Sequence, residues 1–315
     1  MSGNSTPSIP SPDGADVAKA AALLRGGGLV ALPTETVYGL AARADSAEAV
    51  ARIYRAKGRP DFNPLIVHVP SLAVAERLAV FDSRARQLAE AFWPGALTMV
   101  LPLRGDAGIA PAVTAGLPTI ALRCPAHPVM QAVLAAAGVS LAAPSANRSG
   151  GVSPTSAAHV RESLGSAVDM VVDGGPAAQG IESTIVALRP HGWSLLRPGP
   201  ISRQQIAEVL CEGDDAAQPS GQIEAPGQLA SHYSPGKPVR LGAITARSDE
   251  FLIGFGDIAG DISLSAQGDL AEAASRLYAC LHIAAAARQP RIAVAPIPDV
   301  GIGAAINDRL QRAAV

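Results

Sequence analysis

The sequence predicts an α/β protein with a twisted sheet of mixed parallel and antiparallel strands packed with helices, followed by a second, smaller α/β unit. Short apolar runs alternate with segments of helical periodicity, which is the pattern of α/β folds. Some predicted strands follow one another with no helix between them, so part of the sheet is expected to be antiparallel. Residues 211–238 are rich in Pro, Gly, Gln and Ser and lack periodicity, and such a segment is longer than most loops inside a compact domain.

These observations divide the chain into four parts. Residues 1–12 form a Ser/Pro-rich tail that we expect to be disordered. Residues 13–210 form the first α/β unit, and residues 211–238 form a linker. Residues 239–315 form the small second unit.

Caps and helix breakers set the boundaries of the elements. The glycines at 26–28 end the first helix, Ser46 is a suitable N-cap for the second, and the Trp-Pro-Gly turn at 93–95 ends the third. The first unit is predicted to contain, in chain order, helix 15–24, strand 29–32, helix 46–54, strand 65–69, helix 83–92, strands 97–101 and 119–122, helix 129–137, strand 140–143, helix 154–164, strands 168–172, 183–187 and 194–196, and helix 202–210. The second unit is predicted to contain strands 239–241, 252–255 and 262–264, helix 270–287, strand 292–295 and helix 304–314.

Composition excludes several classes of protein. Hydrophobic residues make up 48% and charged residues 17%, which indicates a folded chain with a sizeable core. A net charge of -2 argues against a protein that coats nucleic acid. The three scattered cysteines form no disulfide framework, and no apolar run reaches the roughly 18 residues that a membrane span needs. With no basic, apolar leader at the N-terminus, the sequence predicts a cytoplasmic protein without a membrane segment.

Several well-known catalytic motifs are absent from the sequence. There is no GxxxxGK[ST] loop, no GxSxG elbow and no HExxH helix, and the six histidines show no metal-ligand spacing. The sequence therefore predicts no metal site made of protein side chains.

Polar residues instead gather where predicted strands end. The segment 33–40, PTETVYGL, follows a strand and carries Thr34, Glu35 and Thr36. Such positions bind ligands in α/β proteins, although taken alone the segment is explained somewhat better by a helix start with Thr34 or Thr36 as its cap. The loop KGRPDFNPL at 57–65 presents Lys57 and Arg59 together, which suits a polyphosphate but is also compatible with a solvated basic turn.

Further strand ends repeat this pattern. Arg123 ends an apolar strand and needs an anionic partner, either an internal carboxylate or a ligand. Small hydroxyl-bearing turns follow at 143–150 and 180–185, and Arg197 lies in LRPG. A His-Tyr-Ser-Pro island at 232–235 lies in the linker without an evident structural reason. Together, the cations and hydroxyls predict a site for a phosphorylated, anionic small molecule that is bound without a P-loop.

These segments resemble those of the Sua5/YrdC/YciO family, the threonylcarbamoyl-AMP synthases. The shared motifs are PTETVYGL, KGRPDFNPL, the WPG turn, the strand from Thr119 to Arg123, PSAN at 144–147, Glu182-Ser183-Thr184 and LRPG. HYSP and the terminal GIGAAINDRLQRAA are similar to the long, two-domain Sua5 form. The resemblance implies a YrdC-like catalytic domain with a concave positive cavity over 13–210 and a small Rossmann-like Sua5 domain over 239–315.

The resemblance also implies a reaction and its residues. L-Threonine, bicarbonate or CO2 and ATP would give threonylcarbamoyl-AMP and pyrophosphate, the precursor of the t6A modification of tRNA; the protein would thus be a nucleotidyltransferase with downstream t6A-transfer proteins as partners and tRNA as an indirect one. The implied threonine contacts are Thr36, His68, Arg123, Ser183 and the backbone of Ala143. The implied ATP contacts are Arg59, Asn63, Thr119, Ser145, Ser153, Arg197 and Tyr233, with Lys57 at the phosphates.

The expected chemistry fits these residue types. Threonine carbamate is already an anion and attacks the α-phosphorus without a covalent enzyme intermediate, so positioning and positive charge are what the reaction needs. Lys57, Arg59 and Mg2+ are expected to supply the charge, and Arg123 to hold the amino-acid carboxylate. We expect an apolar wall of Val37, Leu40, Leu65 and Ile66 to exclude water from the adenylate.

Two alternative functions remain open, and residues 211–238 are expected to have a role in the site. An RNA-binding module with a positive concave face is the alternative from another class, and the low net charge speaks against it. A carbamoyl-adenylate enzyme with another acceptor is the second. Residues 211–238 are expected to act as a lid over the cavity, with Tyr233 as its latch, and protection of this segment from proteolysis by ATP plus threonine would test that expectation.

Overall fold

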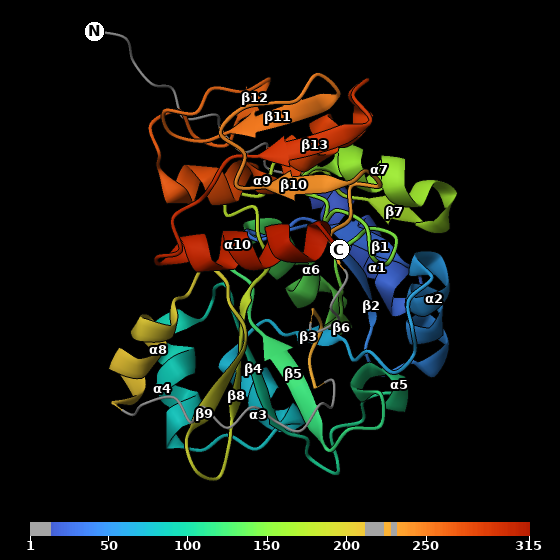
Figure 1. Cartoon of the computed structure of the whole chain (residues 1–315). Coiled ribbons are helices and arrows are strands. Elements are labelled where there is room, and N and C mark those ends of the chain that lie inside the picture. Colours follow the sequence, from blue (N-terminus) through green and yellow to red (C-terminus); the bar gives the residue numbers. More distant parts are fainter. Residues whose placement is uncertain (1–13, 212–223, 228–231) are drawn as a thin grey trace, which may run out of the picture.

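The computed structural model describes residues 14–211, 224–227 and 232–315. The predicted tail at 1–12 lies outside the described residues, as do 212–223 and 228–231 of the predicted linker. Two sheets organise the rest of the chain, a large one formed by the first two thirds of the sequence and a small one near the C-terminus (Figure 1). The predicted fold class, a mixed α/β sheet followed by a smaller α/β unit, is confirmed.

The large sheet has nine strands in the order β7-β1-β2-β6-β3-β5-β4-β8-β9. Its pairings mix parallel neighbours (β1 with β7, β3 with β5, β4 with β8) and antiparallel ones. The consecutive strands β1 and β2, and β8 and β9, are joined by short connections and pair antiparallel. Its strands are β1 (Val30–Leu32), β2 (Gly39–Arg43), β3 (Ile66–His68), β4 (Leu97–Pro102), β5 (Thr119–Arg123), β6 (Leu141–Ala142), β7 (Met170–Val171), β8 (Thr184–Leu188) and β9 (Trp193–Arg197).

Helices of the first unit begin at side-chain caps that the sequence makes visible. Ser46 accepts a hydrogen bond from the amide of Ala49, and Asp82 accepts one from the amide of Ala85. The α-helices are α1 (Gly14–Arg25), α2 (Ala47–Lys57), α3 (Leu72–Leu78), α4 (Ser83–Phe92), α5 (Pro111–Thr114), α6 (Pro128–Ala137), α7 (Ala157–Leu164) and α8 (Arg203–Leu210), and a short 3-10 helix spans Gly165–Ala167.

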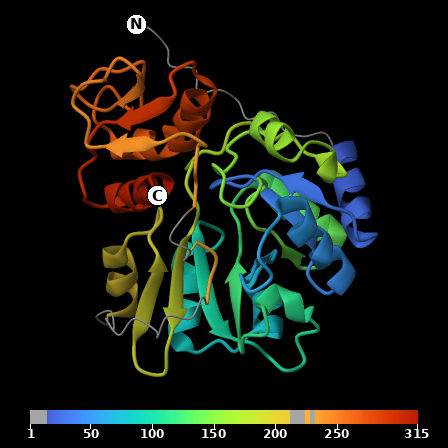
Figure 2. The same ribbon diagram turned by 45° about the vertical axis from the view of Figure 1, so that its right-hand side comes forward.

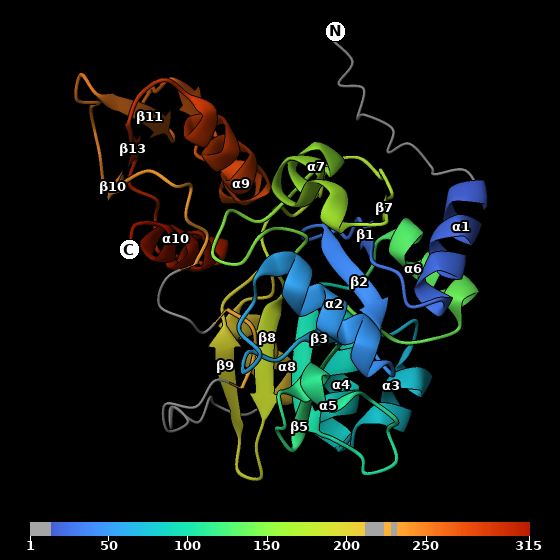
Figure 3. The same cartoon turned by 90° about the vertical axis from the view of Figure 1, so that its right-hand side faces the viewer.

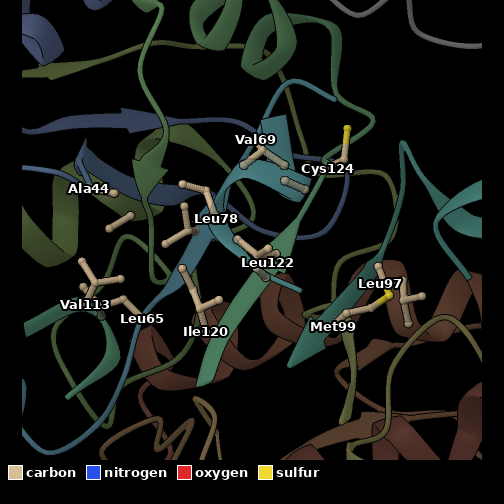
Figure 4. Close-up of a cluster of buried hydrophobic side chains, with 14 of the residues drawn as sticks. Ala44, Leu65, Val69, Leu78, Leu97, Met99, Val113, Ile120, Leu122 and Cys124 are labelled. Atoms are coloured by element: carbon tan, nitrogen blue, oxygen red, sulfur yellow. The ribbon is translucent and has the colours of Figure 1, made fainter. Parts of the chain in front are cut away.

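The two faces of the large sheet are covered differently. Leu97, Met99 and Leu122 belong to the main core, which includes residues of α2, α4 and α8 (Figure 4). On the opposite face of the middle strands, a smaller apolar cluster contains Ile66 and Ala121 together with Ala225 from the segment 224–227. None of the described members of that smaller cluster belongs to a helix. The described covering of this cluster is therefore the segment around Ala225 rather than a helix.

The second unit is a four-stranded parallel sheet in the order β10-β13-β11-β12. Its strands are β10 (Val239–Leu241), β11 (Glu250–Gly254), β12 (Ile262–Ser263) and β13 (Arg291–Val294), and its helices are α9 (Leu270–Ala286) and α10 (Ile302–Ala313). Both helices share one apolar cluster with Ile253 and Val294, so they cover the same face of the sheet. Lys237 donates to the carbonyls of Ala284 and Ala287 and closes the end of α9.

The second unit sits against the first through these two helices. Figures 1 and 3 show α10 between the small sheet and the ends of β8 and β9, and Figure 3 shows α9 beside α7. Figure 2 shows the second unit, in orange and red, above the yellow strands β8 and β9 at one side of the large sheet. Among the described residues, none of the helices combines the length and the hydropathy that a bilayer span requires.

The predicted elements are confirmed within a few residues at their ends. Strand 239–241 and helix 83–92 have the predicted bounds. Four elements were not predicted: β2, α3, α5 and the short 3-10 helix Gly165–Ala167. The sequence of β2, GLAAR, contains neither a β-branched nor an aromatic residue, so its strand character comes from pairing with β1 and β6 rather than from local preference.

Candidate active site

A cavity opens on the concave face, where β3 and β5 end side by side. The register pairs His68 with Arg123 and Ile66 with Ala121, and alternation along each strand turns these four side chains to one face of the sheet. The lining residues are Thr34, Thr36, Val37, Gly39, Arg59, Ile66, His68, Arg123, Ala143, Pro144, Ser145, Glu182, Ser183, Arg197, Pro226, Gly227, His232 and Tyr233.

Most of the predicted site residues meet at this cavity. Of the predicted threonine contacts, all five line it; of the predicted ATP contacts, four do. These nine are Thr36, His68, Arg123, Ala143, Ser183, Arg59, Ser145, Arg197 and Tyr233. They come from sequence segments nearly 200 residues apart, so the fold brings together motifs that the sequence leaves separate.

Arg123 is held in place by three hydrogen bonds. Its Nε donates to the carbonyl of Gly95 at 3.1 Å, its Nη1 to Oγ1 of Thr36 at 2.8 Å and its Nη2 to Oε1 of Glu35 at 2.6 Å. A guanidinium has five N–H donors, so two remain for a ligand. Burial raises the pKa of the Glu35 carboxyl, but Arg123 outweighs it and the pKa is lowered overall, which keeps the partner of Arg123 ionised.

His68 lies beside this pair as a neutral ring. Burial, and after it the charge of Arg123, lower the pKa of His68 to about 3. Its Nδ1 is buried without a hydrogen-bond partner among the described residues. A neutral imidazole with a free ring nitrogen at the cavity wall is suited to hydrogen bonding with a small polar ligand.

Two further cations enter the cavity from other elements. Arg59 donates to the carbonyls of Asn63 and Pro64, and burial lowers the pKa of its guanidinium to about 10. Arg197, at the end of β9, donates from Nε and Nη2 to the carbonyl of Ser183. Three arginines thus face one cavity, which makes it a site for anions.

Four predicted contacts do not line the cavity. Lys57 is buried, and its ammonium donates to the carbonyls of Ser145 and Asn147, so it holds the turn that carries Ser145. Thr119 is four residues from Arg123 along β5, about 13 Å away on the same face. Ser153 and Asn63 are buried behind the wall. The roles of these four in ATP binding remain predictions.

The predicted apolar wall is only half present at the cavity. Val37 and Ile66 line it. Leu40 and Leu65 belong instead to the main core. Neighbouring residues of a strand point to opposite faces, so Leu65 and Ile66 could not both face the cavity.

The segment around Tyr233 reaches deep into the site. Tyr233 and Gly227 both line the cavity, and Tyr233 is fully buried with a hydroxyl that has no partner among the described residues. The cavity has a volume of about 50 Å³, far below the roughly 300–1,000 Å³ of ordinary ligand pockets. A nucleotide therefore requires these side chains, or others of the wall, to move outward.

Glu182 lines the cavity, although its motif predicted no role for it. It accepts hydrogen bonds from Ser153 at 2.6 Å, from Tyr278 at 2.7 Å and from Arg309 at 3.2 Å. Its place in the Glu182-Ser183-Thr184 motif was the available sequence signal. Nothing in the sequence connects it with Tyr278 or Arg309, which lie in the second unit.

The cavity offers protein ligands for anions rather than for metal ions. Among the described residues there is no group of three or more His, Cys, Asp or Glu side chains that could hold a metal. Of the described lining residues, Glu182 supplies the one carboxylate, and three donors already occupy it. The described lining residues therefore supply no cage of protein ligands for a metal ion.

Taken together, a mixed sheet with an arginine-lined concave face and a parallel second sheet docked above it define an anion-binding α/β protein of two units. Residues 22–199 match the Sua5/YciO/YrdC family, described as telomere recombination, and residues 201–315 match the C-terminal domain of threonylcarbamoyl-AMP synthase. The chain belongs to the Sua5/YrdC/YciO family, in its two-domain form.

Individual relatives agree with this membership. A threonylcarbamoyl-AMP synthase of Bacillus subtilis is 39% identical over 326 aligned positions, which cover 95% of this chain and 92% of the relative. One of Pyrococcus abyssi is 43% identical over 70% of this chain and 66% of the relative. The crystal structure of P. abyssi Sua5 complexed with L-threonine superimposes with a TM-score of 0.87 at 34% identity, covering 95% of this chain and 94% of that one.

Proposed function

We propose that this protein is a threonylcarbamoyl-AMP synthase, which converts L-threonine, bicarbonate or CO2 and ATP into L-threonylcarbamoyl-AMP and pyrophosphate. The observation that carries the proposal is the convergence of Arg59, Arg123 and Arg197 with Thr36 and His68 around one cavity. A family of relatives with this name over nearly the whole chain supports the same activity.

Threonine is proposed to bind at the ends of β3 and β5. The two unused N–H groups of Arg123 would hold its carboxylate, and Thr36 and His68 would contact its polar groups. The P. abyssi protein, which was crystallised with L-threonine, supports an amino-acid subsite in this fold.

ATP is proposed to lie along the open face toward Arg59 and Arg197. The threonine amine adds to CO2 to give a carbamate, and a carbamate oxygen attacks the α-phosphorus while the bond to the β-phosphate oxygen breaks and pyrophosphate leaves. Guanidinium groups near the phosphates stabilise the charge that develops on the five-coordinate phosphorus and on pyrophosphate. Mg2+ bound to the triphosphate would add positive charge there.

The segment with Tyr233 is proposed to act as the lid of this site. Its entry into a cavity of about 50 Å³ supports this role, because the same side chains would have to leave when ATP enters and could return over the bound nucleotide. A closed lid would exclude water from the adenylate, with Val37 and Ile66 as apolar wall. Delivery of the product to t6A-transfer proteins in the cytoplasm, with tRNA as an indirect partner, belongs to the same proposal.

A pyrophosphate-release assay with ATP and bicarbonate, with and without L-threonine, tests the function. We expect release that depends on L-threonine and is not supported by other amino acids. Release driven equally by another amino acid would favour a carbamoyl-adenylate enzyme with a different acceptor, and no release under any condition would refute the proposal.

A further inference from the structure

Two side chains of the second unit reach the wall of the cavity. Tyr278 of α9 and Arg309 of α10 both contact Oε2 of Glu182, at 2.7 and 3.2 Å. Arg309 is fully buried, and its Nη1 donates to the carbonyl of Pro198 at 2.7 Å. The guanidinium also lies over the ring of Tyr233, 5.8 Å from its centroid. The second unit therefore touches the first unit and the linker at the same point.

The two units are packed closely against each other near Glu182. Gly180, two residues before Glu182, has φ +70°, and a Cβ added there would lie 2.4 Å from the carbonyl oxygen of Ser275 on α9. On the next turns of the same helix, Tyr278 binds Glu182 and His282 binds the carbonyl of Ser153 at 3.2 Å. One face of α9 thus fixes the loop that carries Glu182.

Glu182 is an unusual neighbour for a triphosphate, because it brings negative charge to the wall of an anion site. Burial raises the pKa of its carboxyl, but Arg309 and next Arg197 outweigh burial and hold the pKa at about 2. The carboxylate is therefore charged, and its partners must offset that charge. Arg309 is paired directly with Glu182, whereas Arg197 acts on the pKa of Glu182 through its charge, and of these two arginines Arg197 lines the cavity.

We propose that Arg309 is a positioning residue for nucleotide binding: by neutralising Glu182 from the second unit, it leaves the positive charge of Arg197, whose guanidinium is held by Ser183 and Pro226, available to the phosphates of ATP. Without Arg309, Arg197 becomes the remaining cation for Glu182, and a buried carboxylate without its main partner repels the nucleotide. The inference rests on the proposed function for the identity of the nucleotide. It gives the second unit a defined part in the active site.

This proposal can be tested by removing the cation, the carboxylate or both. The variants are Arg309→Met, Glu182→Gln and the double variant that combines them. The affinity for the non-hydrolysable analogue α,β-methylene-ATP is measured by calorimetry. We expect Arg309→Met to weaken it by about tenfold or more, since a buried charge is left unpaired. In the double variant no unpaired carboxylate remains, so the affinity should return to within about threefold of Glu182→Gln. Threonine carries no net charge, and its affinity should change by less than about threefold throughout.

Arg276→Met is the matched control, because Arg276 is on α9 of the same unit and pairs with Glu272, whereas Arg309 pairs with Glu182 and Asp308. It should bind the analogue like the wild type. A double variant that binds as weakly as Arg309→Met, or an equal loss of threonine affinity, would show that Arg309 only holds the fold. If Arg309→Met does not fold, the double variant still tests the proposal, because the proposal requires the double variant to fold and to bind the analogue.

Binding and turnover separate the two proposals. A wild-type chain that binds the analogue but releases no pyrophosphate with threonine refutes the proposed function, and the affinity series then still tests Arg309. A wild-type chain that does not bind the analogue overturns both.

Discussion

The guanidinium of Arg123 lies 2.6 Å from Oε1 of Glu35, so the cation that is proposed to hold the amino acid is itself held by a carboxylate. Both side chains are nearly buried, and Thr36 and Gly95 bind two further corners of the guanidinium. This arrangement fixes the direction of the two free N–H groups before any ligand arrives, which reduces the entropy that binding must overcome.

Arg123→Lys tests whether threonine binding needs the planar shape of the Arg123 guanidinium as well as its charge. Lysine keeps the positive charge but cannot reproduce the planar fork, so we expect threonine affinity to fall by about tenfold or more while affinity for α,β-methylene-ATP changes by less than about threefold. Calorimetric titration with each ligand is the measurement. Arg104→Lys, at an exposed Arg–Asp pair, is the control, and an equal loss of both affinities in Arg123→Lys would contradict the assigned subsite.

Arg59→Ala should abolish pyrophosphate release and leave threonine binding intact, because Arg59 is proposed to act on the phosphates and not on the amino acid. The assay is pyrophosphate release, accompanied by a threonine titration. Arg55→Ala removes an exposed arginine one turn earlier on α2 and should behave as the wild type. Turnover at the wild-type rate in Arg59→Ala would refute the phosphate role.

Tyr233→Phe should leave the free protein as stable as the wild type or slightly more stable. The hydroxyl is buried without a partner among the described residues, so its removal takes away a desolvated polar group and no hydrogen bond seen there. If the hydroxyl binds the nucleotide, the KM for ATP should rise about five- to tenfold. Urea unfolding and steady-state kinetics are the two readouts; unchanged kinetics would mean that only the ring of Tyr233 matters.

Acid should weaken the contact between the two units through a histidine pair. The rings of His159 on α7 and His282 on α9 stack with centroids 3.9 Å apart. Burial, and next the neighbouring His282, lower the pKa of His159 to about 4, from 6.5. Between these values the unfolded chain binds a proton that the folded one does not, so stability falls as the pH drops from about 6.5 to about 4.

His159→Asn should reduce that pH dependence, and the other buried histidines, whose pKa values burial also lowers, should keep part of it. Asparagine places an acceptor near the position of Nδ1, which takes the amide hydrogen of Thr155, and carries no charge in this range. Urea unfolding at pH 7 and pH 5 measures the difference. His191→Asn, in the exposed turn between β8 and β9, is the control, and a slope in His159→Asn equal to that of the wild type would place the acid sensitivity elsewhere.

Local sequence patterns predicted most elements because the periodicity and the caps are local properties. Ser46 and Asp82 each satisfy an amide three residues ahead, and a reader of the sequence can see both ends of such a bond. By contrast, β2 exists because of its neighbours in the sheet, and its own residues do not indicate it.

For the candidate site, too, the sequence predicts single residues but not the contacts between distant segments. Arg123 was predicted because a cation at the end of an apolar strand needs a partner, and the sequence left open whether that partner is internal or a ligand; the structure shows Glu35 and two remaining donors. The motif around Lys57 predicts a phosphate ligand, but its ammonium donates hydrogen bonds to the carbonyls of Ser145 and Asn147. These two residues are 88 and 90 positions further along the chain, so the sequence does not reveal the contact. Arg309 and Glu182 are 127 residues apart, and no local pattern connects them.

The helix-free cluster of Ile66, Ala121 and their neighbours has a consequence for how the protein responds to its substrates. The main core on the other face includes residues of α2, α4 and α8, whereas this cluster includes the segment around Ala225 and adjoins the cavity through Ile66. A nucleotide and an amino acid bound in that cavity would stabilise the folded chain by mass action, so saturating substrates should raise its melting temperature.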